Sequence, residues 1–392
     1  MKIALIGTRG VPARYGGFET CVEEVGQRLA AAGHAVTVFC RRSDDETGPP
    51  LANYLGMSLV HLPVVRRRSL ETLAHTTLSV LHRSLSGTDA AVVFNAANAP
   101  LLPVVKARRI PVATHVDGLE WRRGKWGPTG QRYYRAAESL SVRWSDALIA
   151  DAQGIADYYA AEFSAQTELI AYGAPILTDP GAERVRELGF EPGRYHLVVA
   201  RFEPENHVLE IVRGYVASAA TLPLVVVGSA PYADAYTASL RAAADGRVHL
   251  VGGIWDADQV NELYANALTY LHGHSVGGTN PSLLRAAGAG TFTIAHDNVF
   301  NREVLAEDAT YFAGPADVAR LVVAAEADPQ RTRDRGRDLQ AEIRRYNWDD
   351  VAARYEDLCQ RLARRELGPR PSGRRTGVDI RALEPERQPV HT

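Results

Sequence analysis

Cysteine is scarce in this chain of 392 residues, which contains only Cys21, Cys40 and Cys359. The three lie far apart and form no Cys-x-x-Cys pair, so neither a disulfide framework nor a zinc site is indicated. A reducing cytoplasm is the compartment that best fits this usage. His272 and His274 have a metal-like spacing, but no carboxylate cluster accompanies them, and we expect no metal site.

The chain also lacks an excess of charge of either sign and a long hydrophobic run. Its 44 Lys and Arg residues nearly balance 46 Asp and Glu residues, so no general positive field is available for nucleic acid. No apolar run approaches the ~18 residues needed to cross a bilayer, and the opening MKIALIG lacks a signal-peptide pattern. We therefore expect a cytoplasmic protein. The arginines at 66–68 leave a peripheral contact with the inner membrane face open, with a solvated charge run as the alternative.

Short apolar segments alternate with helical segments along most of the chain. In the first half, the predicted strands are 2–6, 35–40, 59–62, 91–94, 112–115, 147–150 and 168–170. In the second half, they are 196–200, 224–227, 248–250, 268–271 and 291–295. Apolar strands that alternate with helices are typical of parallel sheets covered on both faces. The sequence therefore predicts an α/β protein with two doubly wound, Rossmann-like domains.

Glycine and proline interrupt this alternation between residues 178 and 193, where we place an interdomain linker. The predicted domains are then 1–178 and 190–347. Residues 348–363 follow as a helix with one apolar stripe. The tail, 364–392, is rich in Pro, Gly and Arg, and we expect it to be disordered.

A glycine loop, GTRGVPARYGGFET at residues 7–20, joins the first predicted strand to the first helix. Its glycines do not follow the GxGxxG spacing of a dinucleotide turn. Residues 40–42 (CRR) also stand where a ribose-binding carboxylate would end the second strand, so NAD(P) chemistry is disfavoured. Gly16 and Gly17 allow close approach of the backbone to a diphosphate or a sugar, with a plain tight turn as the alternative.

The segment THVDGLEWRRGKW at 114–126 follows a strand whose carboxyl end is expected to face ligands. Asp117 is a candidate to orient or deprotonate a hydroxyl group. Trp121 and Trp126 are candidates to stack on a sugar or on lipid. The alternative is structural, with Asp117 capping a turn and both tryptophans buried.

The segment ARFEPENH at 200–207 follows the first strand of the second half. Arg201 would lie at the strand end, where a guanidinium can bind a diphosphate with two hydrogen bonds and stabilise the charge of a leaving group. A salt bridge to Glu203 or Glu205 is the alternative.

The segment LHGHSVGGTNPSLLRA at 271–286 combines a strand end, a glycine loop and a capped helix start. Asn280 suits the N-cap and Pro281 the first helical position. Such a helix start favours phosphate. Arg285 lies about one turn into this helix, near the positive end, where a phosphate partner would stabilise it; a solvated arginine is the alternative.

Together, these four segments resemble a retaining GT-B glycosyltransferase of the glycogen-synthase-like group, over residues 1–362. Bacterial β-1,4-rhamnosyltransferases of polysaccharide assembly carry the same YGGFE and VGGTNPSLL blocks. The resemblance implies two Rossmann-like domains that face a central cleft, with the last helix crossing back to the N-terminal domain. It also implies an acceptor in the N-terminal domain, a nucleotide-sugar co-substrate in the C-terminal domain, and no metal or other cofactor.

The resemblance further implies roles for individual residues. Asp117, Arg201 and Arg285 become the catalytic candidates, of which Arg201 supports the leaving diphosphate and Asp117 lies near the acceptor hydroxyl. The implied donor-binding residues are Gly16, Gly17, Arg201, Asn206, Ser275, Gly277, Gly278, Thr279, Asn280, Ser282 and Arg285. The implied acceptor-binding residues are Tyr15, Phe18, Glu19, His115, Asp117, Glu120 and Trp121.

The chain departs from this group at two positions that usually hold glutamate, which are Ser275 and Arg285 here. A basic residue of the group is also replaced by Asn206 or His207. The second glutamate normally accepts hydrogen bonds from ribose hydroxyls, and a deoxyribose donor offers one hydroxyl fewer. We therefore expect transfer of L-rhamnose from dTDP-L-rhamnose, with retention, to a hydroxyl of a glycan or lipid-linked glycan. Tailoring of a small natural product and noncatalytic nucleotide-sugar binding remain as alternatives.

Overall fold

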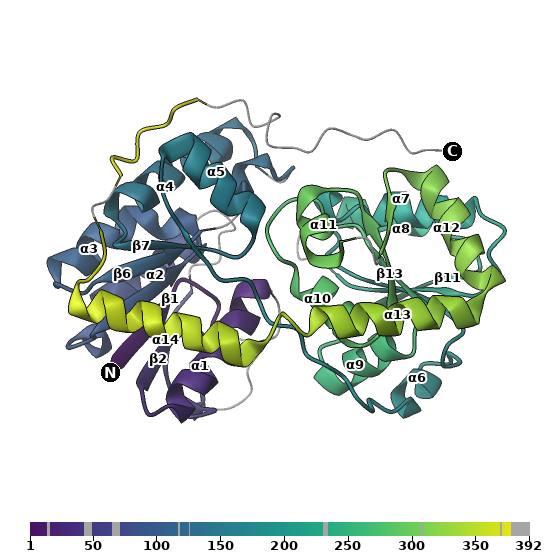
Figure 1. Cartoon of the computed structure of the whole chain (residues 1–392), viewed down its shortest axis with the longest axis horizontal. Coiled ribbons are helices and arrows are strands. Elements are labelled where there is room, and N and C mark those ends of the chain that lie inside the picture. Colours follow the sequence, from purple (N-terminus) through teal and green to yellow (C-terminus); the bar gives the residue numbers. More distant parts are fainter. Residues whose placement is uncertain are drawn as a thin grey trace. The chain divides into compact units, whose positions relative to one another are not determined.

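A computed structural model of the chain describes residues 1–13, 16–42, 49–64, 71–116, 118–124, 126–229, 234–306, 309–368 and 371–377 (Figure 1). Tyr15 and Asp117, both predicted site residues, lie outside the described residues, as do the arginines at 66–68. The described chain divides into two compact units. The first comprises 1–122, 126–172 and 348–377, and the second comprises 123–124 and 173–347. Among the described residues, no helix is both long and apolar enough to cross a bilayer.

The first unit is built on an eight-stranded sheet with the order β3-β4-β2-β1-β5-β6-β7-β8. Its strands are β1 (Lys2–Ile6), β2 (Ala35–Arg41), β3 (Asn53–Tyr54), β4 (Met57–Leu62), β5 (Ala90–Phe94), β6 (Val112–His115), β7 (Ala147–Ala150) and β8 (Glu168–Leu169). The short β3 pairs antiparallel with β4 at one edge, and the other neighbours pair in parallel. The strand order reverses between β1 and β5.

The helices of the first unit include one from the far end of the chain. They are α1 (Gly17–Ala31), α2 (Glu71–Leu81), α3 (Leu102–Ala107), α4 (Pro128–Trp144), α5 (Gln153–Phe163) and α14 (Trp348–Arg364). The apolar stripe of α14 is buried, including Val351, Tyr355 and Leu358, and this helix packs against α1. An ion pair of 2.6 Å between Arg28 Nε and Asp349 Oδ1 joins the same two helices. The predicted return of the last helix to the N-terminal unit is confirmed.

The segment 371–377 also lies on the first unit, where the sequence predicted disorder. The Arg375 guanidinium forms ion pairs with the buried carboxylates of Glu138 on α4 and Glu162 on α5, the latter at 2.9 Å. The backbone N–H of Thr376 donates to the carbonyl of Glu162 at 2.8 Å. Gly373 has a φ of +71°, and a Cβ there would lie 2.3 Å from the carbonyl oxygen of Ser139. This part of the tail is therefore docked.

The second unit is a six-stranded, fully parallel sheet with the order β11-β10-β9-β12-β13-β14. Its strands are β9 (His196–Val199), β10 (Leu224–Val227), β11 (Val248–Gly252), β12 (Thr269–His272), β13 (Phe292–His296) and β14 (Thr310–Phe312). Its helices are α6 (Glu183–Glu187), α7 (Val208–Val216), α8 (Asp234–Ala243), α9 (Ala257–Ala265), α10 (Pro281–Gly288), α11 (Val299–Leu305), α12 (Pro315–Ala327) and α13 (Pro329–Ile343).

Helices cover both faces of this second sheet, because successive side chains of its central strands point to opposite faces and nearly all of them are buried. Val198 packs in a cluster with residues of α7 and α12, whereas its neighbour Leu197 packs with residues of α9 and α10. The predicted doubly wound architecture is therefore confirmed. Its strand order reverses between β9 and β12.

The region 178–193 is part of the second unit, where the sequence predicted a linker. It contains α6, in which Val185 is buried, and the backbone N–H of Arg184 donates to Glu262 Oε2 at 2.8 Å. Gly181 and Gly189 have positive φ angles of 74° and 83°. The glycines in this region therefore mark turns around a short packed helix, which the sequence pattern alone does not distinguish from an extended connection.

Glu326 on α12 accepts several hydrogen bonds inside the second unit. His196 Nε2 lies 3.0 Å from its Oε1, and the backbone N–H groups of Thr221 and Leu222 donate to its carboxylate at 2.8 and 3.0 Å. Burial raises the pKa of Glu326, but these donors outweigh burial and lower it to about 2. The carboxylate therefore contributes stability that is present above the ordinary pKa of 4.5 and is lost as pH falls toward 2.

We expect Glu326→Gln to destabilise the protein at pH 7, and we expect the difference from wild type to shrink as pH falls through 4. Urea unfolding at several pH values measures this. Glu342→Gln is the matched control, because the Glu342 side chain is 61% exposed. A stability difference that does not change with pH would contradict the account.

Candidate functional site

The two segments that the sequence singled out in the second half meet at the strand-order reversal of the second unit. Open α/β sheets bind ligands in the crevice at such a reversal, beyond the carboxyl ends of the strands. The loop after β9 and the loop after β12 are joined there by hydrogen bonds. Asn206 Oδ1 lies 2.8 Å from His274 Nδ1, and the backbone N–H of Ser275 donates to the Glu205 carbonyl at 3.0 Å.

The helix start after β12 has the predicted geometry. Asn280 is the N-cap of α10, and its Oδ1 accepts from the backbone N–H of Ser282 at 2.9 Å, with Pro281 at the first helical position. Gly277 in the preceding loop has a φ of +132°, and a Cβ there would lie 3.1 Å from His274 Nε2. Glycine at 277 is therefore needed both for the backbone conformation and for the space beside His274.

Arg201 lies two residues beyond the end of β9 and keeps 36% of its side chain exposed. Its nearest ion-pair partner is Glu203, with Nη1 and Oε2 3.8 Å apart. The salt bridge that the sequence left as an alternative therefore exists, but an ion pair of this length and exposure is weak. Arg201 remains available to a stronger anion such as a diphosphate.

Arg285 is the fifth residue of α10, about one turn from the helix start, as predicted. It lies in the last turn of α10, which contains eight residues. A cation in a last turn is stabilised by the negative end of the helix dipole, so a phosphate partner is not needed to explain this arginine. Because the helix has only eight residues, this position is also close to its negative end, and the phosphate partner of Arg285 stays a prediction.

Ser275 and Glu205 change the chemistry expected of this edge. The hydroxyl of Ser275 donates to the Glu205 carbonyl at 3.1 Å, so its proton is already used in a hydrogen bond within the protein. Glu205 is a buried carboxylate that pairs with Arg123 at 3.5 Å, and neither of its carboxylate oxygens accepts a hydrogen bond. The carboxylate of Glu205 therefore keeps unused acceptor capacity inside the protein. The sequence treated Glu205 only as a partner for Arg201, because burial is not visible in the pattern EPEN.

Two histidines of this edge, His272 and His274, are held as neutral groups. Burial lowers the pKa of His272 to about 3, and burial lowers the pKa of His274 well below its usual value. His207 and His296 stack with ring centroids 4.2 Å apart. Throughout the described part of the chain, no three His, Cys, Asp or Glu side chains gather closely enough to hold a metal ion. Metal independence itself stays a prediction.

The described residues predicted to bind the acceptor lie in the first unit, together with Gly16 and Gly17. His115 ends β6 and is fully buried, and the Phe18 ring packs edge-on against it at a centroid distance of 5.0 Å. Glu19 accepts from the backbone N–H of Arg9 at 2.9 Å, and a Cβ on Gly16 would lie 2.5 Å from Glu19 Oε2. A Cβ at Gly16 would displace only the flexible end of the Glu19 side chain, and the Gly16 backbone is extended, with a φ of 169°, so neither observation requires glycine there.

Glu120 and the two tryptophans have mostly structural contacts. Trp126 Nε1 donates to Glu120 Oε1 at 3.3 Å, and its ring packs on Tyr134 with centroids 5.0 Å apart. The Arg135 guanidinium lies 5.1 Å from the Trp121 ring centroid, while the buried indole N–H of Trp121 has no hydrogen-bond partner. The structural alternative therefore describes Trp126, and Trp121 stays a candidate acceptor contact.

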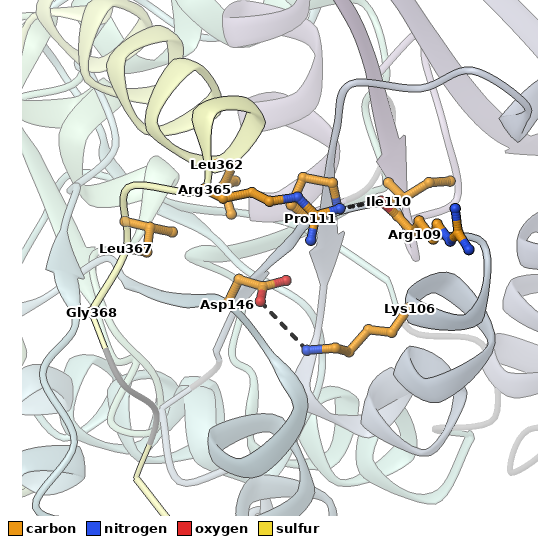
Figure 2. A pocket seen from close by; sticks show the side chains of 9 residues that line it. All are labelled: Lys106, Arg109, Ile110, Pro111, Asp146, Leu362, Arg365, Leu367 and Gly368. Atoms are coloured by element: carbon orange, nitrogen blue, oxygen red, sulfur yellow. Dashed lines mark hydrogen bonds and ion pairs between the residues drawn. The ribbon is translucent and has the colours of Figure 1, made fainter.

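A pocket of about 160 Å³ elsewhere in the first unit contains none of these residues. Figure 2 shows Pro111 and Asp146 in its wall, together with the end of α14 and the chain that follows it. Pro111 and Asp146 precede β6 and β7, so the pocket lies at the amino ends of the strands, opposite the ligand edge. Arg365 Nη2 donates to the Arg109 carbonyl across it at 3.1 Å. We assign this pocket no role in the site.

Comparison with known proteins places the chain among glycosyltransferase sequences. Residues 16–173 match the family model of the glycosyl transferase 4-like domain, and residues 219–357 match that of a glycosyl transferase-like domain. Both units therefore contain sequence that matches a glycosyltransferase family model. A search of the curated proteins gave no match.

Solved structures with the same architecture span nearly the whole chain. Sucrose-phosphate synthase from Thermosynechococcus elongatus is 20% identical with a TM-score of 0.74, covering 92% of this chain and 98% of its own. HepE of Anabaena, solved with UDP and glucose, is 17% identical with a TM-score of 0.74 and covers 92% and 99%. A glycosyltransferase from Rickettsia africae is 12% identical with a TM-score of 0.67 and covers 92% and 98%. The chain has the GT-B fold of these proteins.

Proposed function

We propose that the chain transfers a sugar from a nucleoside-diphosphate sugar to a hydroxyl group, with retention of the anomeric configuration. The donor we favour is dTDP-L-rhamnose. The acceptor we favour is a glycan or lipid-linked glycan of a cell-surface polysaccharide, with a peripheral contact at the inner membrane face. The first unit would bind this acceptor and the second unit the donor.

The observation that carries this proposal is the junction of the loops after β9 and β12. The partly exposed guanidinium of Arg201 lies there on the same sheet edge as the capped start of α10. A diphosphate develops negative charge as the bond between the sugar C1 and its phosphate oxygen breaks, and such a site stabilises that charge. The acceptor oxygen forms the new bond to C1 on the same face, and its proton passes to the leaving phosphate oxygen.

The preference for a deoxyribose donor rests on two side chains. Ser275 has committed its hydroxyl proton to the Glu205 carbonyl, and Arg285 offers donors but no acceptor. A ribose hydroxyl would lack the carboxylate that related enzymes place at these positions. HepE was solved with UDP, so a uridine donor is the comparison that matters most.

Thermal unfolding with a panel of nucleotides tests the donor. A ligand that binds only the folded protein at 100 times its Kd adds about 2.7 kcal/mol of stability, which raises the Tm by several degrees. We expect dTDP and dTDP-L-rhamnose to raise it more than UDP and UDP-glucose, with dTMP as a control that lacks the diphosphate. A larger shift with UDP would overturn the choice of donor, and no shift with any nucleotide would overturn the function.

A noncatalytic nucleotide-sugar-binding protein is the second candidate. The observation that favours it is the absence of a carboxylate at both Ser275 and Arg285. Radiolabelled donors separate the two functions, because an enzyme releases labelled sugar to an acceptor or to water. Binding without transfer or hydrolysis for every donor tried would favour the second candidate.

A further inference from the structure

A buried chain of polar groups in the first unit joins α1 and α14 to the end of β6. Cys21 Sγ lies 3.5 Å from the hydroxyl of Tyr355, and the same hydroxyl lies 3.2 Å from His115 Nδ1. All three side chains are fully buried. Cys21 and Tyr355 are not among the predicted site residues. The chain that they form ends at His115, which is a predicted site residue.

The direction of these hydrogen bonds follows from the groups themselves. Burial raises the pKa of Cys21 to about 12 and that of Tyr355 well above its usual value, so both keep their protons. The tyrosine hydroxyl can donate to His115 Nδ1 or to the sulfur of Cys21. An imidazole nitrogen is a strong acceptor and sulfur a weak one. The favoured arrangement therefore runs from the thiol to the hydroxyl and from the hydroxyl to Nδ1.

This direction determines where His115 carries its proton. Burial lowers the pKa of His115 to about 3, so its ring is neutral with one N–H group. A neutral imidazole that accepts at Nδ1 must hold its proton on Nε2. Nε2 is buried and has no hydrogen-bond partner. A buried N–H without a partner is rare in native proteins, and one explanation is a missing ligand.

The rings around His115 hold it in one orientation. Phe18, Phe94 and Tyr172 pack against it with centroid distances of 5.0, 5.3 and 5.8 Å. His115 is the last residue of β6, and Phe18 belongs to the first turn of α1. Both therefore lie at the carboxyl edge of the sheet, where parallel α/β sheets bind their ligands.

We propose that Tyr355 is a positioning residue, which keeps the proton of His115 on Nε2 so that His115 donates a hydrogen bond to a hydroxyl oxygen of the sugar acceptor. The identity of this ligand rests on the function proposed above; the state of the imidazole does not. His115 would then bind and orient the acceptor as a neutral donor, and it would not act as a general base.

Nitrogen-15 NMR of the full chain labelled at histidine reports the tautomer directly. We expect the wild type to carry the proton of His115 on Nε2 with Nδ1 unprotonated. Tyr355→Phe removes only the hydroxyl and should give a mixture of the two tautomers. Cys21→Ala removes the competing sulfur acceptor and should retain the wild-type pattern. Tyr172→Phe is the matched control, because it removes a hydroxyl from another ring that packs on His115.

Initial rates of sugar transfer supply the second readout. We expect Tyr355→Phe to lower kcat/KM for the acceptor about tenfold, the effect of one hydrogen bond, with an unchanged KM for the donor. A wild-type proton on Nδ1, or the same tautomer in Tyr355→Phe, would overturn the inference. If the tautomer behaves as expected but the protein transfers no sugar, the inferred protonation state of His115 is correct. The proposed function is then wrong, and so is the sugar acceptor as the ligand of His115.

Discussion

Replacing Arg201 with alanine is expected to lower the rate of sugar transfer by about 10²- to 10³-fold, the range found when one preorganised donor to a developing negative charge is removed. The guanidinium is partly exposed, and its ion pair with Glu203 spans 3.8 Å. Its loss should therefore leave the fold intact. Initial rates with radiolabelled donor measure the effect, and thermal unfolding without ligand checks the fold.

Two further variants make this prediction specific. Glu203→Gln should change the rate by only a few-fold, because an ion pair of 3.8 Å to a partly exposed arginine contributes about 0–1 kcal/mol. Arg320→Ala should have no effect, since Arg320 is a 60% exposed arginine on α12. If Arg201→Ala retained half of the wild-type rate, the assignment of Arg201 to the leaving diphosphate would be wrong.

Replacing Arg375 with alanine is expected to destabilise the first unit by about 3–5 kcal/mol, because it removes the guanidinium that forms ion pairs with two buried carboxylates. The side chains of Glu138 and Glu162 are only 3% and 2% exposed. The Tyr158 hydroxyl donates to Glu138 at 2.8 Å but cannot neutralise its charge. Urea unfolding measures the loss. Arg374→Ala is the matched control, since this neighbouring arginine is exposed.

The effect of Arg375→Ala should depend on pH. Burial raises the pKa of Glu138 from 4.5 to about 7, although Arg375 lowers it. Removing the arginine raises this pKa further. A raised carboxyl pKa means that the folded state binds protons more tightly than the unfolded state, so its stability falls as pH rises. The variant should therefore be closest to wild type near pH 5 and furthest from it near pH 8. An equal loss at both pH values would contradict this explanation.

Most of the fold could be predicted from the sequence, because its central strands are buried on both faces and read as apolar runs. The strands 2–6, 112–115, 147–150 and 224–227 have the predicted bounds. The two- and three-residue strands β3 and β14 were missed, since runs this short carry no periodic pattern. The docked segment 371–377 was missed for another reason. Arg375 finds its partners on helices 213 and 237 residues earlier in the chain, and composition alone indicates only a polar tail.

The candidate site was predictable where its signals are local. Asn280 and Pro281 begin α10 as their types predict, and the loops 200–207 and 271–286 meet because parallel strands share one carboxyl edge. Tyr355 was interpreted only as part of an apolar stripe, although its hydroxyl contacts His115, 240 residues away in the chain. Arg285 lies about one turn into α10, as predicted, but the end of the helix could not be predicted, and in a helix of eight residues the same position belongs to the last turn.

Hydrogen–deuterium exchange with dTDP-L-rhamnose tests the central claim, that a nucleoside diphosphate binds at the strand reversal of the second unit. We predict slower exchange in peptides that cover 200–207 and 272–285, and loss of that protection in Arg201→Ala. A nucleotide that binds the wild type and raises its Tm, yet slows exchange in neither loop, would contradict the account.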